Sequence, residues 1–243
     1  IGNIQDSFNV GRELGSCLDK EGLVHAFVLS DGLKVNGSAL VEGIIKELPP
    51  GVKITGGLSG DYDRFSETLV ICNGVPEKDK VGILGLYGEH FNVGYGFFGG
   101  WDPFGPERLI TQSQGNILHE LDGKSCLGLY KKYLGEHAGG LPATALFFPL
   151  SIRLQGRQSR LVRTVLSVNE EDQSMIFAGD VPEGSYAQFM KANINRLIDA
   201  AIEAAKMSAP VTGGADTQLA LLISCVGRKM VLKQRVEEEV EGV

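Results

Sequence analysis

Residues 224–228, Ser-Cys-Val-Gly-Arg, carry the side chains best suited to hold a small acid. Arg228 could pair with a ligand carboxylate through parallel N–H groups of its planar guanidinium. Ser224, Cys225 and Gly227 would stand where a strand leads into a helix, a place where backbone amides bind anions. Two structural alternatives stay open. Arg228 could pair with an acidic neighbour inside the protein, and Cys225 is favoured as a buried structural cysteine.

Residues 56–61, Gly-Gly-Leu-Ser-Gly-Asp, form a second stretch of this kind. Their small residues predict a tight turn whose backbone amides could cradle an anion, with Ser59, Gly60 and Asp61 as contacts. The stretch also comes close to the Gly-x-Ser-x-Gly turn of serine hydrolases, but Asp61 stands where that motif needs its last glycine. A plain tight turn after a strand is the alternative.

A catalytic role is the least favoured interpretation of these residues. Ser59 or Cys225 could act as a nucleophile only with a base within roughly 3 Å, and His119 is the nearest candidate base. Trp101, the single tryptophan, lies in a loop-like stretch. It could cover the apolar part of a ligand or fill the core beneath the loop. We therefore expect no catalytic residue, and we expect ligand contacts from Trp101 and the two stretches above.

The elements around these residues are expected to alternate between helix and strand at first. Apolar spacing predicts helices over 6–18 and 38–48, and near-continuous apolar runs predict strands over 23–29 and 52–55. Such alternation is typical of a parallel sheet covered by helices. Residues 56–61 follow directly after the second of these strands.

Short apolar runs further along the chain indicate more strands. Residues 68–72, 81–86 and 91–97 are expected to form an antiparallel meander. Residues 219–225 read as a buried strand, followed by a helix over 228–240. The expected fold is therefore mixed α/β, with parallel and antiparallel sheets flanked by helices, and two stacked sheets in an α-β-β-α arrangement are one form it could take.

The composition narrows the class of partner. The 243 residues carry 23 Lys and Arg against 30 Asp and Glu, a net charge of −7. An acidic chain of this kind argues against binding to nucleic acid or to an anionic membrane. No apolar run reaches the roughly 18 residues of a membrane-spanning helix. The 4 cysteines are far apart, which indicates free thiols in a reducing cytoplasm.

No cofactor and no metal are expected. The Gly-x-Gly-x-x-Gly pattern of residues 94–99 is followed by Gly100, Trp101 and Pro103 rather than by the helix that a dinucleotide site requires. The 4 histidines are scattered, and no cysteine–histidine pair has metal-ligand spacing.

In their order along the chain, these motifs resemble the FIST domain, a sensory module of bacterial signalling proteins that also occurs in eukaryotic F-box proteins. The resemblance covers nearly the whole chain and is carried by residues 56–61 with Phe65, 100–106, 120–123, 148–150, 181–184 and 224–228. It divides the chain into residues 1–98, an N-terminal half shortened at its start, and residues 99–243, a C-terminal half.

The resemblance implies a sensory role, with small ligands such as amino acids. It implies no established catalytic machinery and supplies no residue-level site, so the contacts named above rest on chemistry alone. We expect a cytoplasmic sensory domain that binds a small anionic or zwitterionic metabolite and is read by a fused or associated output domain. The alternative is a protein-interaction module, as in the F-box relatives, which would show an exposed apolar patch.

Overall fold

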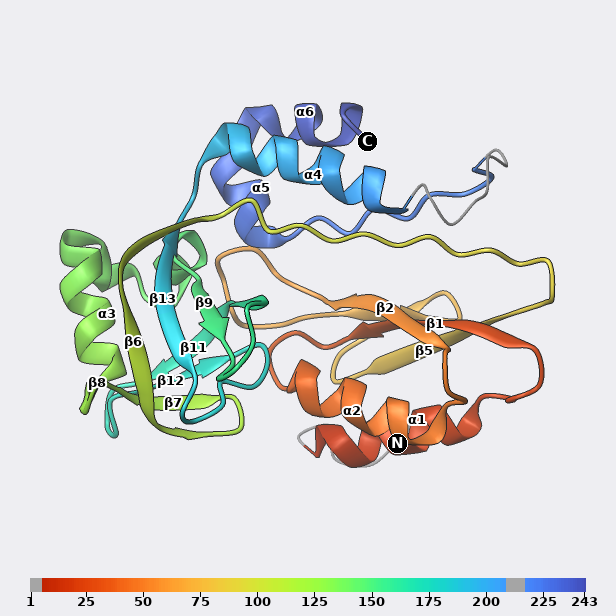
Figure 1. Ribbon diagram of the computed structural model, residues 1–243, viewed down its shortest axis with the longest axis horizontal. Helices are drawn as coiled ribbons and strands as arrows, with labels where there is room; N and C mark the ends of the chain where they lie inside the picture. Colours follow the sequence, from red (N-terminus) through yellow and green to blue (C-terminus); the bar gives the residue numbers. More distant parts are fainter. Residues whose placement is uncertain (1–5, 209–216) are drawn as a thin grey trace.

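The first part of the chain alternates helix and strand, as its apolar spacing predicts. The computed structural model describes residues 6–208 and 217–243 (Figure 1). It begins with α1 (Ser7–Cys17), β1 (Leu23–Ser30), α2 (Gly37–Glu47) and β2 (Lys53–Leu58). The side chains of Asp6 and Asn36 cap the two helices by accepting hydrogen bonds from first-turn amides.

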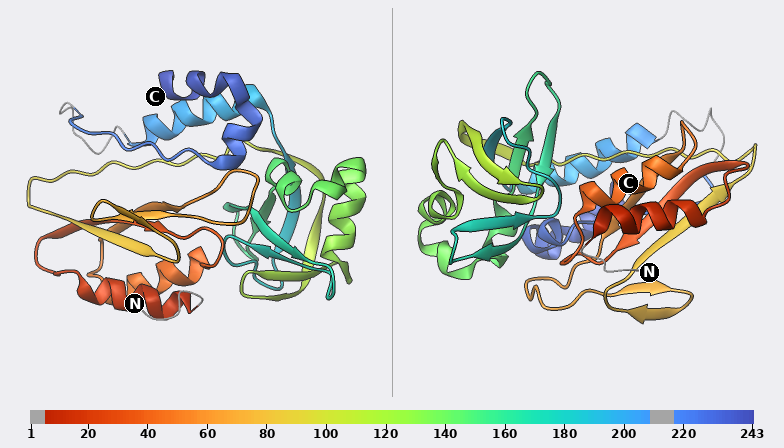
Figure 2. Two further views of the ribbon diagram at one scale, coloured as in Figure 1. Left: turned by 180° about the vertical axis from the view of Figure 1, so that it is seen from behind. Right: turned by 90° about the horizontal axis from the view of Figure 1, so that it is seen from below.

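β1 is the central strand of a small mixed sheet. It runs parallel to β2 and antiparallel to β5 (Val81–Tyr87), in the order β2-β1-β5. The meander expected between residues 68 and 97 is wrong, because β5 pairs with β1 and not with its neighbours in sequence. Between β2 and β5, β3 (Val70–Cys72) and β4 (Val75–Glu77) form a separate hairpin that stands apart from the sheet in Figure 2.

α1 and α2 pack together on one face of this sheet with their backbones in contact. A Cβ atom at Gly11 would lie 2.2 Å from the carbonyl oxygen of Leu40, and one at Gly43 would lie 2.0 Å from that of Phe8. Only glycine allows this approach. The core below the helices is apolar and consists of Val10, Leu14, Val28, Val35, Leu40, Ile44 and Val81.

The second part of the chain is a curled antiparallel sheet of 8 strands, ordered β10-β9-β13-β6-β7-β12-β11, with β8 beside β7. It lies beside the small sheet along the long axis of the molecule (Figure 1). The strands are β6 (Asp102–Gln114), β7 (Ile117–Leu121), β8 (Lys124–Ser125), β9 (Leu150–Arg153), β10 (Arg160–Arg163), β11 (Val165–Asn169), β12 (Ser174–Phe177) and β13 (Tyr186–Lys191).

The core of the curled sheet is built around α3 (Cys126–Leu134), which the short 3-10 helices η1 (Gly135–Gly140) and η2 (Ala143–Phe147) follow. Tyr130, Phe177 and Phe189 are its largest fully buried side chains. With parallel and antiparallel pairing and helices on the sheet faces, the mixed α/β fold class is confirmed.

The chain ends in a group of helices: α4 (Ile194–Ser208), α5 (Val226–Leu232), the 3-10 turn η4 (Lys233–Arg235) and α6 (Val236–Glu241). The single helix expected over residues 228–240 is wrong. Lys233 has a φ of 51°, a left-handed conformation that breaks the helix between α5 and α6. Trp101, Met190, Leu197 and Leu232 form the core beneath these helices.

The strands expected over residues 91–97 and 219–225 are also wrong. Both segments lack strand pairing and are extended, and many of their apolar side chains are exposed, with Phe97 at 76% and Leu219 at 77%. Local apolar runs predicted strands, but a strand forms only where a second strand provides its hydrogen bonds.

We expect Gly43→Ala to lower the free energy of unfolding by about 1–3 kcal/mol, because the added methyl group would push α1 and α2 apart. This expected change already includes the gain of about 1 kcal/mol that alanine brings over glycine in a helix interior. Urea unfolding measures the change. Gly139→Ala is the matched control, since a Cβ atom there meets nothing within 4 Å. Equal stability of Gly43→Ala and wild type would contradict the backbone contact.

Candidate functional site

The two predicted stretches meet at the carboxyl ends of β1 and β2. After β2, the chain turns through Ser59 and Gly60 beside the residues that lead into α5. A Cβ atom at Gly57 would lie 3.1 Å from Ile223 Cγ2, and one at Gly60 only 2.6 Å from Val226 Cγ2. The parallel strands thus place the turn against the start of α5, at the edge where sheets of this kind bind ligands.

Ser59 is fixed to the neighbouring strand. Its amide and its hydroxyl both donate to the carbonyl oxygen of Ser30, at 2.8 and 3.0 Å. Among the described residues, no hydrogen bond joins Ser59 to a histidine. Because a serine nucleophile needs a base to remove its proton, this geometry does not support a hydrolase reaction at Ser59.

The carboxylate of Asp61 organises the loop that follows it. Oδ1 accepts from the amide of Phe65 at 3.1 Å, and Oδ2 accepts from the amides of Ser66 and Glu67 at 2.8 and 2.9 Å. Burial pushes the pKa of Asp61 upward, but the hydrogen bonds from Glu67 and Ser66 together outweigh burial and hold the pKa below its ordinary value. Asp61 is therefore a charged anchor for its own loop.

Asp31 occupies the corresponding place after β1, and the sequence analysis missed it. It is 2% exposed, and its Oδ1 accepts from the amides of Leu33 and Lys34 at 3.0 and 2.7 Å. Its Oδ2 accepts from the hydroxyl of Thr68 at 2.5 Å. The available signal was a serine at or directly after the end of each of the two parallel strands with an aspartate one or two residues later, Ser30-Asp31 at β1 and Ser59-Gly60-Asp61 at β2.

Arg228 is used inside the protein. Its Nε donates to Glu239 Oε1 at 2.5 Å, and its terminal nitrogens donate to the carbonyl oxygens of Leu197, Gly99 and Phe98 at 2.5, 3.1 and 3.4 Å. Arg228 is 8% exposed and Glu239 is 6% exposed. The guanidinium thus connects α5 to α6 and α4, which corresponds to the structural alternative that the sequence left open.

Ser224, Cys225 and Gly227 differ in whether they are already in contact with other parts of the protein. Ser224 donates to the other oxygen of Glu239, at 3.0 Å, and so completes the pairing of that carboxylate. Gly227 packs against η2, where a Cβ atom would lie 3.1 Å from the carbonyl oxygen of Leu146. Cys225 is an exposed free thiol, so the expectation that it is buried is wrong.

Trp101 lies in the core beneath the C-terminal helices. It is 8% exposed and packs with Met190, Leu197 and Leu232. Its indole fills space between β6 and the helices, which corresponds to the core alternative of the sequence analysis.

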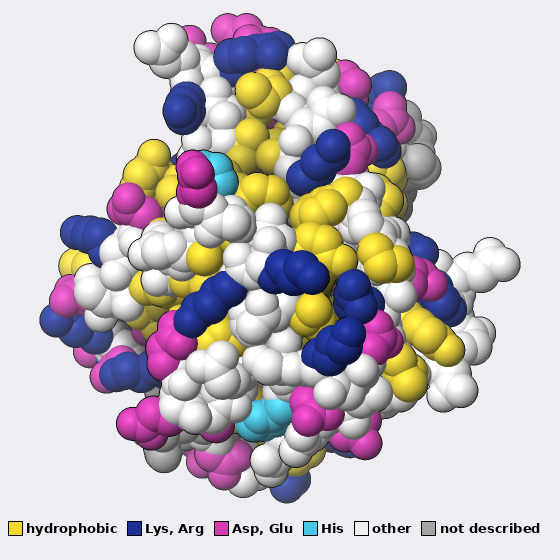
Figure 3. Space-filling model, turned by 90° about the vertical axis from the view of Figure 1, so that its left-hand side faces the viewer, with side chains coloured by type: hydrophobic (Ala, Val, Ile, Leu, Met, Phe, Trp, Pro, Cys, Tyr) yellow, Lys and Arg dark blue, Asp and Glu magenta, His cyan; other side chains and the backbone are white. Residues whose placement is uncertain are grey.

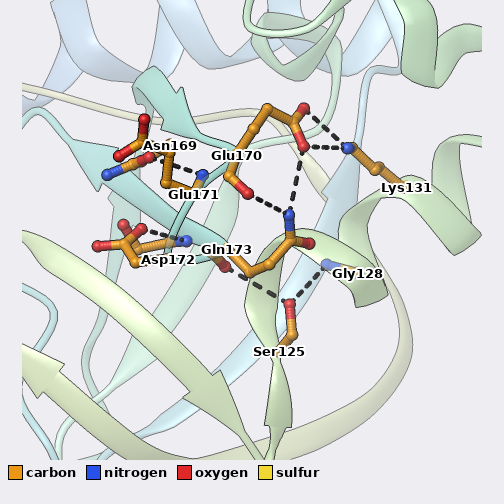
Figure 4. A network of polar contacts seen from close by, with 9 residues as sticks. Ser125, Gly128, Lys131, Asn169, Glu170, Glu171, Asp172 and Gln173 are labelled. Carbon is orange, nitrogen blue, oxygen red and sulfur yellow. Dashed lines mark hydrogen bonds and ion pairs between the residues drawn. The ribbon is translucent and has the colours of Figure 1, made fainter.

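His119 lies on β7 in the curled sheet, near Asp172. Asp172 belongs to an acidic turn between β11 and β12 (Figure 4). In that turn Glu170 accepts two hydrogen bonds from Lys131 of α3, at 2.7 and 2.6 Å, and Asp172 accepts one from the amide of Ser174. Among the described residues, no hydrogen bond joins His119 to either candidate nucleophile.

Surface charges are paired in the same way elsewhere. Arg153 and Arg160 flank Glu107, with nitrogen–oxygen distances of 2.8 and 2.6 Å, and lower the pKa of Glu107 to about 2. On the face seen in Figure 3, positive and negative side chains are interspersed.

A shallow open hollow lies on the outer side of α1, away from every predicted site residue. It is lined by Asp6, Asn9, Val10, Arg12, Glu13, Ser16 and Glu47. In the part of the chain that the structure describes, no three His, Cys, Asp or Glu side chains are grouped to hold a metal ion. Within those same residues, no helix has the length and apolar character needed to cross a membrane.

Models of two known protein families together match almost every residue of the chain. The family model of the FIST N domain matches residues 1–124, and that of the FIST C domain matches residues 126–243. The division near residue 98 stays a prediction. An uncharacterized protein from Methanocaldococcus jannaschii is 25% identical over 204 residues, which cover 78% of this chain and 38% of that protein. The chain thus spans well under half the length of that relative. No solved structure matches the chain.

We expect Arg228→Ala to lower the free energy of unfolding by about 3–5 kcal/mol, because the buried carboxylate of Glu239 would lose its charge partner. Chemical denaturation measures the loss. Arg235→Ala is the matched control: it breaks an exposed, solvent-screened pair with Glu238 and should unfold close to wild type.

The double variant Arg228→Met/Glu239→Leu should recover most of that stability, because no unpaired charge stays buried. A double variant as unstable as Arg228→Ala would show that the pair is not what holds the helices.

We expect Asp61→Asn to destabilise the fold by about 1–3 kcal/mol at neutral pH, because the carboxylate accepts several loop hydrogen bonds. The pKa of Asp61 is lowered by folding, so its stabilising effect is present above its ordinary pKa of 3.8 and is lost as the pH falls further. Unfolding experiments should therefore show the difference between wild type and variant shrinking below about pH 4.

The exposed neighbour Asp63 provides the control, and Asp63→Asn should match wild type throughout the same pH series. A difference between Asp61→Asn and wild type that stays constant down to the lowest pH would refute the anchoring role.

Proposed function

This chain belongs to the FIST family, whose domains are associated with sensory signal transduction, and from that membership we propose that it binds a small anionic or zwitterionic metabolite, such as an amino acid. The contact between the turn after β2 and the start of α5 is the observation that carries this proposal. Ligand binding would shift a conformational equilibrium that a fused or associated output domain reads.

The chemistry of this contact favours backbone groups as the ligand donors. Hydrogen bonds between described residues do not use the amides of Gly60 and Gly227. Cys225 adds an exposed side chain beside them. Backbone amides that converge on one place bind carboxylates and other small anions. In this proposal Ser59 and Asp61 shape the turn, while Arg228, Ser224 and Trp101 hold the helices behind it.

We also propose that the protein works in the cytoplasm. All 4 cysteines are free thiols, and Cys17, Cys72 and Cys225 are exposed. Exposed free thiols persist in a reducing compartment, whereas oxidising compartments favour disulfides.

A protein-interaction module is the second candidate function. It is favoured by the exposed apolar side chains of residues 91–98 and 219–223, among them Phe97 at 76% and Leu219 at 77% exposure. Single exposed apolar residues are ordinary, but contiguous ones mark contact surfaces.

A thermal-shift screen of amino acids and small carboxylates tests the sensory proposal. A ligand at a hundred times its dissociation constant should stabilise the protein by about 2.7 kcal/mol and raise its midpoint. Gly60→Ala and Cys225→Phe would alter the proposed site, and each should weaken binding. Cys72→Phe changes an exposed cysteine on the separate hairpin and should bind as wild type does.

If both site variants bind a ligand as tightly as wild type does, the ligand site does not lie at the contact between the turn after β2 and the start of α5. If folded wild-type protein binds no compound of the screen, the sensory proposal for this ligand class is wrong.

A further inference from the structure

Two extended segments, residues 91–98 and 219–224, expose apolar side chains without any charge among them. In the first, Phe91, Tyr95, Phe97 and Phe98 are 42–76% exposed, and in the second Leu219, Leu221, Leu222 and Ile223 are 50–77% exposed. We call these two segments together the open apolar face. A soluble protein keeps so many contiguous apolar side chains in water at a high cost unless another surface covers them.

Most backbone amides of both segments are also unpaired among the described residues. Between described residues, no amide of residues 92–98 or 219–224 donates a hydrogen bond to another backbone group. Both segments are extended, and an extended chain with free amides is a template for a further strand. The carbonyl oxygen of Phe98, at the end of the first segment, already accepts from Arg228.

Packing holds each segment in place on one flank. Residues 91–98 lie against the end of α4, where a Cβ atom at Gly94 or Gly96 would collide with the carbonyl oxygens of Ser208 or Ala204, at 1.9 Å in both cases. Ile223 lies against Gly57 of β2. Figure 1 shows both segments crossing the molecule between α4 and the three-stranded sheet. The segments are therefore positioned for pairing before a partner arrives.

The sheet itself contributes apolar side chains toward the same side. Leu84 and Leu29 point away from the α1–α2 core, because their neighbours Ile83 and Val28 point into it. Leu84 is 57% exposed and Leu29 is 38% exposed. The open apolar face thus continues onto the outer surface of β1 and β5.

The area of this face and its lack of charge indicate which kind of partner would cover it. The four aromatic side chains are on average about half exposed. Since each has a surface of roughly 150–250 Å², together they expose about 400 Å². The aliphatic side chains of the face bring the total toward the roughly 800 Å² that each partner of a stable interface buries. A neutral apolar face fits a second neutral apolar face, and each copy offers two extended segments with free amides, so two copies can pair segment with segment.

We infer that the open apolar face is the interface of a two-fold symmetric dimer, in which residues 219–224 of one copy pair as a strand with residues 91–98 of a second copy of this chain. This inference goes beyond the sensory role and does not depend on it. Symmetry uses each segment once in each copy, so the pairing closes at two chains.

Sedimentation and light scattering over roughly a hundredfold range of concentration test this inference, because a dimer dissociates by mass action. Wild type should sediment as a dimer. Leu221→Lys places a charge on a side chain that is 64% exposed, and it should weaken dimerisation at least about tenfold. Ala220→Pro removes one pairing amide and should act in the same direction.

Ile45→Lys is the matched control, since Ile45 is 58% exposed on the outer side of α2 and should dimerise as wild type does. Circular dichroism confirms that each variant is folded. The inference is overturned if wild type is monomeric at every concentration, if Leu221→Lys dimerises as tightly as Ile45→Lys, or if the copies assemble into open chains.

Discussion

The guanidinium of Arg228 is the interaction on which the C-terminal arrangement depends. It joins Glu239 of α6, Leu197 of α4 and the chain just before β6, so segments from three parts of the sequence converge on one buried charge. A buried ion pair adds little net stability compared with apolar packing, but it tolerates few alternative geometries. Because the same helices set the position of α5, the pair also determines where the candidate site lies.

The charged residues near the candidate site thus mainly form hydrogen bonds and ion pairs within the protein. Asp31 and Asp61 each close a loop, and Glu239 accepts from both Arg228 and Ser224. These contacts leave the amides of Gly60 and Gly227 unused and the thiol of Cys225 exposed. If the proposed ligand binds there, the ordered loops on either side reduce the entropy that binding would cost.

The parts of the fold that could be predicted from the sequence are those set by local periodicity. α1, β1, α2 and β2 lie where the apolar spacing put them, and the tight turn expected after the second strand follows β2. Residues 91–97 and 219–225 have the same local apolar pattern but form no strand, because strand formation requires hydrogen bonds from a second strand, which the local sequence does not reveal. The partner of Arg228 was equally hidden, because the break at Lys233 turns α6 back toward α5.

Asn36 connects the start of α2 to the curled-sheet part of the chain. Its Oδ1 caps α2 by accepting from the amides of Ser38 and Ala39, while its Nδ2 donates to Asp180 of the curled-sheet part at 2.7 Å. One side chain therefore starts a helix and joins the two parts of the chain. The amide of Gly37 also donates to the carbonyl oxygen of Ala178, and the hydroxyl of Ser38 accepts from the amide of Asp180. The start of α2 is therefore shared between the two parts, and separating them would also remove the hydrogen bonds that surround the cap of this helix.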